Sequence, residues 1–168
     1  AHLREAQGQS GIVYCATRKT VEEVCLSLNA AGFSAVRYHA GLSDEERRRN
    51  QEDFLYDRAN VMVATNAFGM GIDKSNVSFV IHYNMPKNME GYYQEAGRAG
   101  RDGSPAKCIL LYSGQDVVTN RFLIQKGSEE NEELDEEQRE RVRRLDEERL
   151  KKMTFYCFTS DCLRAYIL

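Results

Sequence analysis

Short apolar runs alternate with amphipathic segments along the first two thirds of the chain. Runs of five to seven mostly β-branched, aromatic and small residues predict strands at 11–15, 34–38, 60–65, 77–83 and 106–112. Apolar positions three and four residues apart predict helices at 18–31, 43–56, 88–99 and 115–124. Ser43, with Glu46 three residues later, is typical of a capping box at a helix start.

The alternation of strands and helices indicates βαβ units. Right-handed crossovers then give an α/β fold with a parallel sheet and helices on both of its faces. In such sheets ligands bind at the carboxyl ends of the strands, so we expect functional residues in the loops that follow strands.

The net charge of the whole chain conceals a difference between its segments. The chain has a formal net charge of -3 and an estimated pI of 5.7, which alone argues against a nucleic-acid binder. However, residues 129–150 hold eleven acidic and five basic side chains. Residues 1–128 hold fourteen acidic and fifteen basic side chains and are nearly neutral. We interpret 128–134 as an acidic linker and the segment from Asp135 as a solvated helix with a thin apolar stripe that includes Val142, Leu145, Met153 and Tyr156. The acidity therefore marks a connector and does not exclude nucleic acid.

Five cysteines, odd in number and irregular in spacing, occur without a secretory signal. This pattern favours reduced thiols in a cytosolic protein. We expect Cys15, Cys25 and Cys108 to be buried in apolar segments. Cys157 and Cys162 form half of a tetrahedral zinc site at most. A membrane span is not expected, because no stretch of about 18 apolar residues occurs.

The loop after the third predicted strand is rich in groups that suit phosphate. Gly69 and Gly71 allow close approach of a ligand, and Thr65 and Lys74 offer a hydroxyl and a cation. Asp73 offers acceptors to a ribose hydroxyl or to a protein donor. The alternative is a glycine-rich turn in which the aspartate is a cap.

A second candidate site lies at residues 92–103. If the predicted helix continues through Arg101, then Gln94, Arg98 and Arg101 share one helical face, and glycines clear the space beside them. Two guanidinium groups there suit a polyphosphate whose transferring group gathers charge. The alternative is a solvated basic helix end, although two glycines inside a helix disfavour that interpretation.

Two expected parts of a nucleotide site are missing from the sequence. It contains no Gly-x4-Gly-Lys-Ser/Thr loop and no Asp-Glu pair that follows an apolar strand and could hold magnesium. The chain can supply arginine to a nucleotide but not a phosphate cradle, so it is typical of one half of a two-lobed site. We expect both ends to be cut from a longer sequence, because the chain has no starting Met and stops within an apolar pattern at 166–168.

Four segments together resemble helicase motifs. They are GIVYCATRKTVE (residues 11–22), YHAGL (38–42), ATNAFGMGIDK (64–74) and YQEAGRAGRDG (93–103). The first, third and fourth are similar to motifs IV, V and VI of the RecQ family of superfamily 2 DNA helicases. The resemblance identifies nearly the whole chain with the second RecA-like lobe of such an enzyme and the start of its zinc-binding subdomain.

The resemblance implies roles for individual residues. Arg101 would be the arginine finger, Arg98 would also reach the ATP phosphates, and Gln94 would support them. Gly71 and Asp73 would lie at the nucleotide side of the cleft. The candidates for the path of the DNA backbone are Thr17, Arg18, His39, Thr65 and Lys74. For His39, a structural role within its loop is an equal alternative.

The resemblance also divides the chain. It implies a helicase lobe at 1–127, the linker at 128–134, and at 135–168 the helical start of a truncated zinc-binding subdomain. Cys162 would be one of four zinc ligands and Cys157 none, so zinc is expected in the full protein and not in this chain alone.

The implied activity belongs to the full protein. It would couple hydrolysis of ATP, bound with Mg²⁺ mostly by a first RecA-like lobe, to 3′-to-5′ unwinding of DNA in repair or recombination. Its partners would be that lobe and single-stranded or duplex DNA, and this chain alone is expected to be inactive. The alternatives are a lobe of another superfamily 2 helicase, including one that acts on RNA, and a non-catalytic nucleic-acid-binding module.

Overall fold

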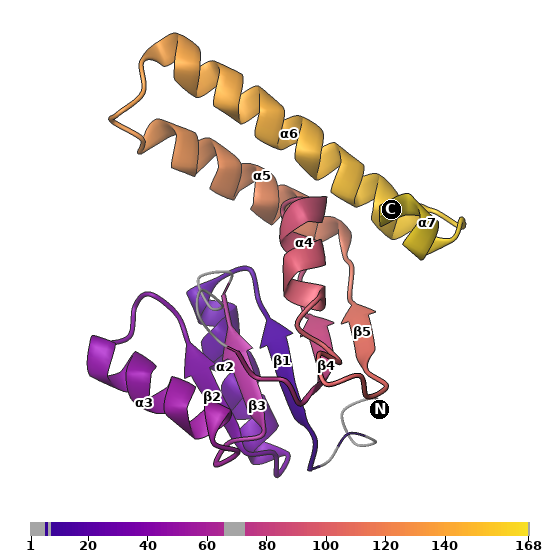
Figure 1. Ribbon diagram of the computed structural model, residues 1–168. Helices are drawn as coiled ribbons and strands as arrows, with labels where there is room; N and C mark the ends of the chain where they lie inside the picture. Colours follow the sequence, from indigo (N-terminus) through magenta and orange to yellow (C-terminus); the bar gives the residue numbers. More distant parts are fainter. Residues whose placement is uncertain (1–5, 7, 66–72, 168) are drawn as a thin grey trace. The chain divides into compact units, whose positions relative to one another are not determined.

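A parallel sheet is the centre of the first part of the molecule. The computed structural model describes residue 6, residues 8–65 and residues 73–167. Within them, five strands form one parallel sheet in the order β2-β3-β1-β4-β5 (Figure 1). The strands are β1 (Ser10–Tyr14), β2 (Ala35–Tyr38), β3 (Val61–Ala64), β4 (Val77–His82) and β5 (Lys107–Leu110). Each overlaps the apolar run that indicated it, and the predicted α/β fold is confirmed.

The helices of the sheet region begin where capping residues indicate. They are α2 (Arg18–Ala30) and α3 (Asp44–Leu55); a later helix, α4 (Met89–Ala96), is divided between the two units described below. Ser43 caps α3 by accepting a hydrogen bond from the Glu46 N–H at 3.2 Å, as predicted. Thr17 caps α2 in the same way through the Thr20 N–H, also at 3.2 Å. Both helices therefore start immediately after loops that follow strands.

Each face of the sheet is covered by its own apolar cluster. Alternate residues of β1 point to opposite faces, so that Val13 and Cys15 pack with α2 while Ile12 and Tyr14 pack with Phe54 of α3. Because both faces are buried, the strands need nearly continuous apolar sequence, which is the pattern from which they were predicted.

Gly11 leaves room for the ring of a phenylalanine on the neighbouring strand. A Cβ at this position would lie 2.1 Å from the ring of Phe79 on the neighbouring strand β4. The ring therefore packs directly on the backbone of β1, and a larger residue at position 11 would displace it.

The chain forms two compact units. The sheet unit contains the described residues up to Tyr83 together with Gln94–Leu111. The helical unit contains residues 84–93 and 112–168, with the helices α5 (Gly114–Glu129), α6 (Glu136–Phe158) and α7 (Leu163–Ile167).

The core of the helical unit lies between α5, α6 and the segment 84–93. Ile124, Leu150, Met153 and Tyr156 are buried, and the ring of Tyr156 lies 5.5 Å from that of Tyr92. Hydrogen bonds of buried polar side chains also connect α5 to the segment 84–93. The Asn120 amide donates to the Met85 carbonyl at 2.8 Å, and the Asn84 amide donates to Asp116 at 3.0 Å.

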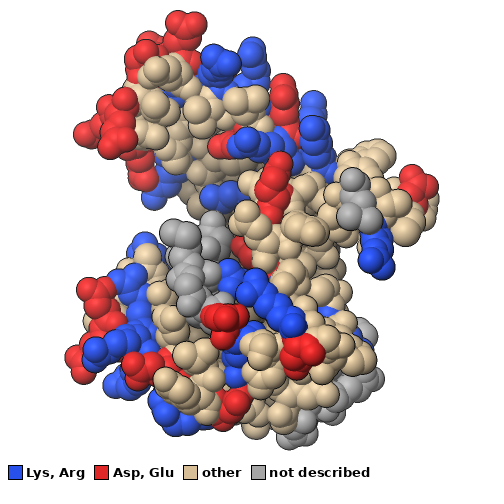
Figure 2. Space-filling view, in the orientation of Figure 1, with Lys and Arg blue, Asp and Glu red and all other residues tan. Residues whose placement is uncertain are grey.

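The acidic connector is shorter than predicted. Helix α5 continues to Glu129, so that Ser128 and Glu129 are helical although we expected them in the linker. Helix α6 begins after Asp135, which caps it in a capping box with Gln138. Acidic side chains gather where α5 and α6 are joined (Figure 2). The expected stripe is buried at Met153 and Tyr156 but remains largely exposed at Val142 and Leu145.

One of the burial predictions was wrong. Cys15 and Cys25 are buried as expected, but Cys108 is exposed because it lies on β5, a strand at the edge of the sheet. Within the described part of the chain, no helix is long and apolar enough to cross a membrane.

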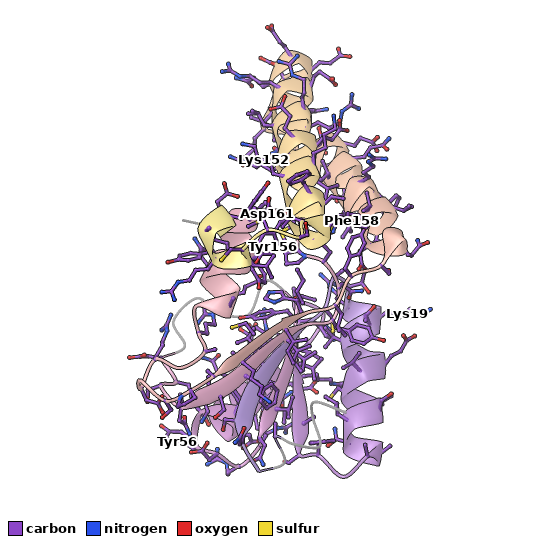
Figure 3. The ribbon with its side chains drawn as sticks, turned by 90° about the vertical axis from the view of Figure 1, so that its right-hand side faces the viewer. Lys19, Tyr56, Lys152, Tyr156, Phe158 and Asp161 are labelled. Atoms are coloured by element: carbon purple, nitrogen blue, oxygen red, sulfur yellow. The ribbon has the colours of Figure 1, made fainter. Side chains whose placement is uncertain are left out.

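Phe54 offers a test of the core. It is fully buried, whereas Tyr56, two residues later, is exposed at the periphery of the sheet unit (Figure 3). We expect Phe54→Ala to lower the free energy of unfolding by about 3–5 kcal/mol, through lost burial and the cavity left behind. The control Tyr56→Ala is expected to cost about 0.5 kcal/mol. Urea unfolding followed by circular dichroism measures both, and equal losses would contradict this assignment of the core.

Candidate functional site

The segment that carries Arg98 and Arg101 is a turn. We predicted a helix at 88–99, and a shared helical face for Gln94, Arg98 and Arg101 if that helix continued. Helix α4 ends at Ala96, and the N–H groups of Arg98 and Ala99 bond three residues back, to Glu95 and Ala96. The prediction of a common helical face was therefore wrong. Gly97 and Gly100, which we predicted to clear space beside a helix, instead lie in the turn that follows the end of α4.

Residues 95–102, here called the arginine segment, are attached to both ends of strand β4. At the carboxyl end of the strand, His82 Nε2 lies 2.6 Å from Glu95 Oε2. At the amino end, the Gly100 N–H donates to the Val77 carbonyl at 2.9 Å, and the Asp102 N–H donates to the Ser75 carbonyl at 3.2 Å. The segment thus runs along β4, and Ala99 packs against the apolar cluster on the α3 face.

Gly100 makes the second attachment possible. Its φ is +67°, a conformation that disfavours any residue with a Cβ. A Cβ at this position would also lie 2.9 Å from the Ser104 carbonyl oxygen. Glycine is therefore required here by both the backbone angle and the available space.

Both guanidinium groups act on Tyr14, the last residue of β1. Burial raises the pKa of the Tyr14 hydroxyl, and the positive charges of Arg98 and Arg101 oppose that rise, while the Glu95 carboxylate adds to it. The ring of Tyr14 stacks on that of His82, with centroids 5.2 Å apart and planes inclined by 19°. The backbone of Arg101 lies at the amino end of β4, between the bonds of Gly100 and Asp102, so the segment does not hold both arginines at the carboxyl edge where the sequence led us to expect the site.

Arg101 is the more accessible of the two. Its side chain is 44% exposed, its Nε donates to the Gly97 carbonyl at 3.3 Å, and a terminal nitrogen lies 3.8 Å from Asp73. Asp73 is 95% exposed, so this pair is weak and an anion can displace the carboxylate. The structure brings Arg101 and Asp73 together, while Gly71 lies outside the described residues. Gln94 is exposed.

A second cluster contains three of the residues predicted to contact DNA. Thr17 caps α2, and Arg18 is the first, exposed residue of that helix. A methyl group on Gly41 would lie 3.0 Å from His39 Nδ1 and 3.4 Å from the Arg18 side chain, so the two loops meet at this glycine. An exposed cation at a helix start, beside a glycine, can contact a phosphate backbone.

His39 holds this loop from within. It is buried, its Nδ1 accepts a hydrogen bond from the Gly41 N–H at 3.1 Å, and its Nε2 lies 2.6 Å from Glu22 Oε1. Burial acts to raise the pKa of Glu22, but hydrogen bonds from His39 and Arg37 outweigh it and hold that pKa below its usual value. Because both ring nitrogens are engaged inside the protein, the geometry favours the structural alternative for His39.

Lys74 is also buried and bonded within the protein. The side chain is 3% exposed, and Nζ lies 2.6 Å from Asp57 Oδ1 and 5.1 Å from the ring centroid of Phe54. The hydrogen bond from Lys74 lowers the pKa of Asp57. This position does not suit the predicted contact with DNA phosphate, because the ammonium group is covered. Thr65 is buried as well, and its N–H donates to the Tyr38 carbonyl.

The cysteines near the end of the chain do not assemble a metal site. Across the described residues there is no cluster of three or more His, Cys, Asp or Glu that could hold a metal ion. Cys162 is exposed and available as a single ligand. Burial, with a smaller contribution from the Asp116 carboxylate, raises the pKa of Cys157 to about 11, which disfavours the thiolate that zinc needs.

Sequence reasoning missed the groups that support both clusters. Tyr14, His82 and Glu95 support the arginine segment, and Glu22 supports the loop of His39. A signal for His82 was present, because a histidine at the end of an otherwise apolar strand must find a polar partner. The partner is 13 residues away along the chain, and no periodic pattern points to it.

A comparison with protein families decides the identity of the chain. A family described as the helicase conserved C-terminal domain matches residues 1–103, which is more than half of the chain. The chain belongs to this family. A second family, described as RecQ zinc-binding, matches residues 114–168, which follow the helicase match along the chain. The predicted resemblance to RecQ helicases is confirmed.

Similar proteins are named as ATP-dependent DNA helicases. The ATP-dependent DNA helicase RecQ of Bacillus subtilis is 48% identical over 167 residues, which are 99% of this chain and 27% of that protein. The ATP-dependent DNA helicase hus2/rqh1 of Schizosaccharomyces pombe is 46% identical over 99% of this chain and 12% of its own length. The helicase domain thus spans about a quarter, or less, of these relatives.

Solved structures share the fold of this helicase domain. A DEAD box protein from Methanococcus jannaschii superposes with a TM-score of 0.61 at 28% identity, over 74% of this chain and 34% of that one. The helicase Lhr of Mycobacterium smegmatis, bound to single-stranded DNA and AMP-PNP, gives a TM-score of 0.57 at 26% identity, over 74% and 18%.

Two glycines of the helicase domain make a matched test of the arginine segment. Gly100 and Gly103 both have positive φ, but only at Gly100 does a Cβ meet backbone, whereas at Gly103 it would meet nothing within 4 Å. We expect Gly100→Ala to lower the free energy of unfolding by about 1 kcal/mol more than Gly103→Ala, since it adds a steric conflict to the backbone strain. Thermal unfolding measures the difference, and equal effects would show that the segment is not packed as described.

Proposed function

We propose that this chain is the second RecA-like motor lobe of a RecQ-type, ATP-dependent DNA helicase that moves 3′ to 5′. The family match, the names of the relatives and the position of Arg98 and Arg101 support this proposal. The full protein would act on DNA in repair or recombination, and would therefore work where the DNA is, in the nucleoid or the nucleus.

The observation that carries the proposal is the exposed guanidinium of Arg101 on a segment attached at two points. Phosphoryl transfer is catalysed largely by groups already positioned around the charge that develops on the γ-phosphoryl oxygens. Arg101 has this property, because its backbone is held to β4 while its side chain is half exposed and only loosely paired with Asp73. Arg98, closer to Tyr14, would hold a second phosphate.

The remaining parts of the ATP site would come from a first RecA-like lobe. The sequence has no phosphate loop and no acidic pair for Mg²⁺, so these groups must be supplied from elsewhere. ATP would bind between the two lobes, and closure of the cleft would bring Arg101 to the γ-phosphoryl group. Opening after hydrolysis would then shift one lobe along the DNA strand.

DNA would be held by the loops at the start of α2. Arg18 would contact a backbone phosphate directly, and Thr17 would add a hydroxyl next to it. His39 would position Gly41 beside Arg18 through its bonds to Glu22 and to the Gly41 N–H, without touching DNA. The Lhr structure, titled as bound to single-stranded DNA, supports nucleic-acid binding by this fold.

Zinc would need three ligands in addition to the one that this chain would supply. Cys162 is exposed and would give one of four thiolate ligands in the full protein, in agreement with the RecQ zinc-binding match. The described residues alone do not fit a zinc ion, so zinc has no role in the steps proposed for Arg101.

Arg101→Ala tests the proposed role in hydrolysis. In the full-length helicase, we expect kcat for DNA-stimulated ATP hydrolysis to fall by about 1,000-fold or more, because the charge of the transition state loses its partner. The KM for ATP should change by less than about fivefold. The control is Arg48→Ala, an exposed arginine on α3 that lies outside the site, and it should leave both constants unchanged. Equal losses in kcat and in ATP affinity would contradict the finger role.

Arg18→Ala tests the proposed DNA path. If Arg18 contacts one phosphate, its loss should weaken binding of single-stranded DNA and reduce the slope of log K against log salt concentration by about 1. Lys19 is the matched control, because it is paired with Glu23 and projects to the outside of α2 (Figure 3). Fluorescence anisotropy at several salt concentrations gives the slopes, and an unchanged slope for Arg18→Ala would remove this residue from the path.

A further inference from the structure

A buried polar cluster lies at the carboxyl ends of β1 and β4, next to the arginine segment. His82, the last residue of β4, is 1% exposed, and its Nε2 lies 2.6 Å from Glu95 Oε2. Its ring stacks on that of Tyr14, the last residue of β1. Burying the His82 ring nitrogen and the Glu95 carboxylate is unfavourable unless they are bonded to each other, so their hydrogen bond favours one geometry.

The cluster meets the arginine segment at its first residues. Glu95 is in the last turn of α4, one residue before the helix ends, and its carbonyl accepts the Arg98 N–H. Arg98 and Arg101 are the positive charges that act on the Tyr14 hydroxyl. Glu95 is thus bonded to His82, whose ring stacks on Tyr14, while its backbone carbonyl holds the first residue of the turn that carries the arginines.

We propose that His82 and Glu95 are a positioning pair for Arg98 and Arg101. Their hydrogen bond fixes the end of α4 on the carboxyl end of β4, and thereby sets the direction in which the arginine segment leaves the helix. This inference rests on the proposed function and extends it to two residues that do not touch ATP.

The chemistry of the pair fits positioning better than stability alone. Apolar residues of similar volume would hold the helix end at least as well, because an ionised group loses hydration when it is buried. A short hydrogen bond between a carboxylate and a ring nitrogen adds direction, which apolar packing lacks. Arginine placement needs this direction, since catalytic groups must be held within about 0.5 Å of the productive geometry.

The second attachment cannot replace the first. At the amino end of β4 the bonds are made by backbone N–H groups of Gly100 and Asp102, beyond Arg98. They fix the segment around Arg101, whereas its exit from α4 is made by the Arg98 and Ala99 N–H groups, which bond to Glu95 and Ala96 and so depend on where Glu95 is held. Only the first attachment depends on side chains, so it can be altered while the backbone bonds remain.

The test uses two substitutions of Glu95 that separate reach from charge, in the full-length helicase. Glu95→Asp keeps the charge but withdraws the acceptor by one methylene group. Glu95→Gln keeps an acceptor in place without the charge and can still bond a neutral His82. If position is what matters, Glu95→Asp should lower kcat for DNA-stimulated ATP hydrolysis by about 10- to 100-fold, with the KM for ATP within about threefold. Glu95→Gln should keep at least about a third of the wild-type kcat.

His82→Phe tests the other partner. It keeps a ring that can stack on Tyr14 but removes the nitrogen that bonds Glu95. We expect a kcat as low as that of Glu95→Asp, and a double variant no lower than the lower single one, because both changes break the same bond. Glu90→Ala, an exposed acidic residue of the same helix, is the control and should be unchanged.

Three outcomes would overturn the inference. They are a wild-type kcat in folded Glu95→Asp, a Glu95→Gln variant as slow as Glu95→Asp, and losses that multiply in the double variant. Thermal unfolding identifies which variants are folded. If His82→Phe does not fold, the comparison of Glu95→Asp with Glu95→Gln tests the inference alone. Arg101→Ala separates this inference from the proposed function. If it is inactive while the Glu95 and His82 variants are normal, only the positioning pair is rejected.

Discussion

Strand β4 holds the arginine segment at both of its ends, and the chemistry open to this domain depends on that. The segment contains two glycines and leaves helix α4 after Ala96, so the regular hydrogen bonds of a helix do not define the path of its later residues. Its path is defined instead by His82 at the carboxyl end of the strand, and by the carbonyls of Val77 and Ser75 at the amino end. A guanidinium that must meet charge developing at a phosphoryl group needs such external support.

The amino end of β4 is itself fixed by a buried lysine. Lys74 reaches Asp57, which also accepts hydrogen bonds from the Ser10 hydroxyl and the Asn76 amide. These bonds tie the first residue of β1 and the loop before β4 to the turn after α3. Asp57 thus bonds the residues on both sides of Ser75, Lys74 and Asn76, and the Ser75 carbonyl accepts the Asp102 N–H. The contribution of Lys74 to the site is indirect, through the position of the strand.

The sequence allowed the sheet and the helix starts to be predicted, because both depend on local patterns. Strands buried on two faces need continuous apolar runs, and Ser43 and Asp135 cap helices through groups three residues away. The exit from α4 was predicted wrongly, because the helical spacing of Gln94, Arg98 and Arg101 continues past Ala96, whereas Gly100 bonds to Val77, a residue 23 positions earlier that no local pattern indicates. The partners of Lys74 and His82 lie 17 and 13 residues away, so burial of the lysine and pairing of the histidine could not be found locally. Cys108 was misjudged because an apolar run does not reveal that its strand lies at an edge.

Two histidine–glutamate pairs support the two parts of the proposed function in the same way. In each, a buried histidine at the carboxyl end of a strand places Nε2 2.6 Å from a glutamate on a helix, His39 with Glu22 and His82 with Glu95. The environments differ, since the Glu22 side chain is 32% exposed and also binds Arg37, whereas that of Glu95 is 16% exposed. Solvent and a second cation can compensate for a loss at the first pair more easily than at the second. The arginine segment should therefore depend more strongly on its histidine than the loop beside Arg18 does, in keeping with the stricter geometry that phosphoryl transfer requires compared with a contact to a DNA phosphate.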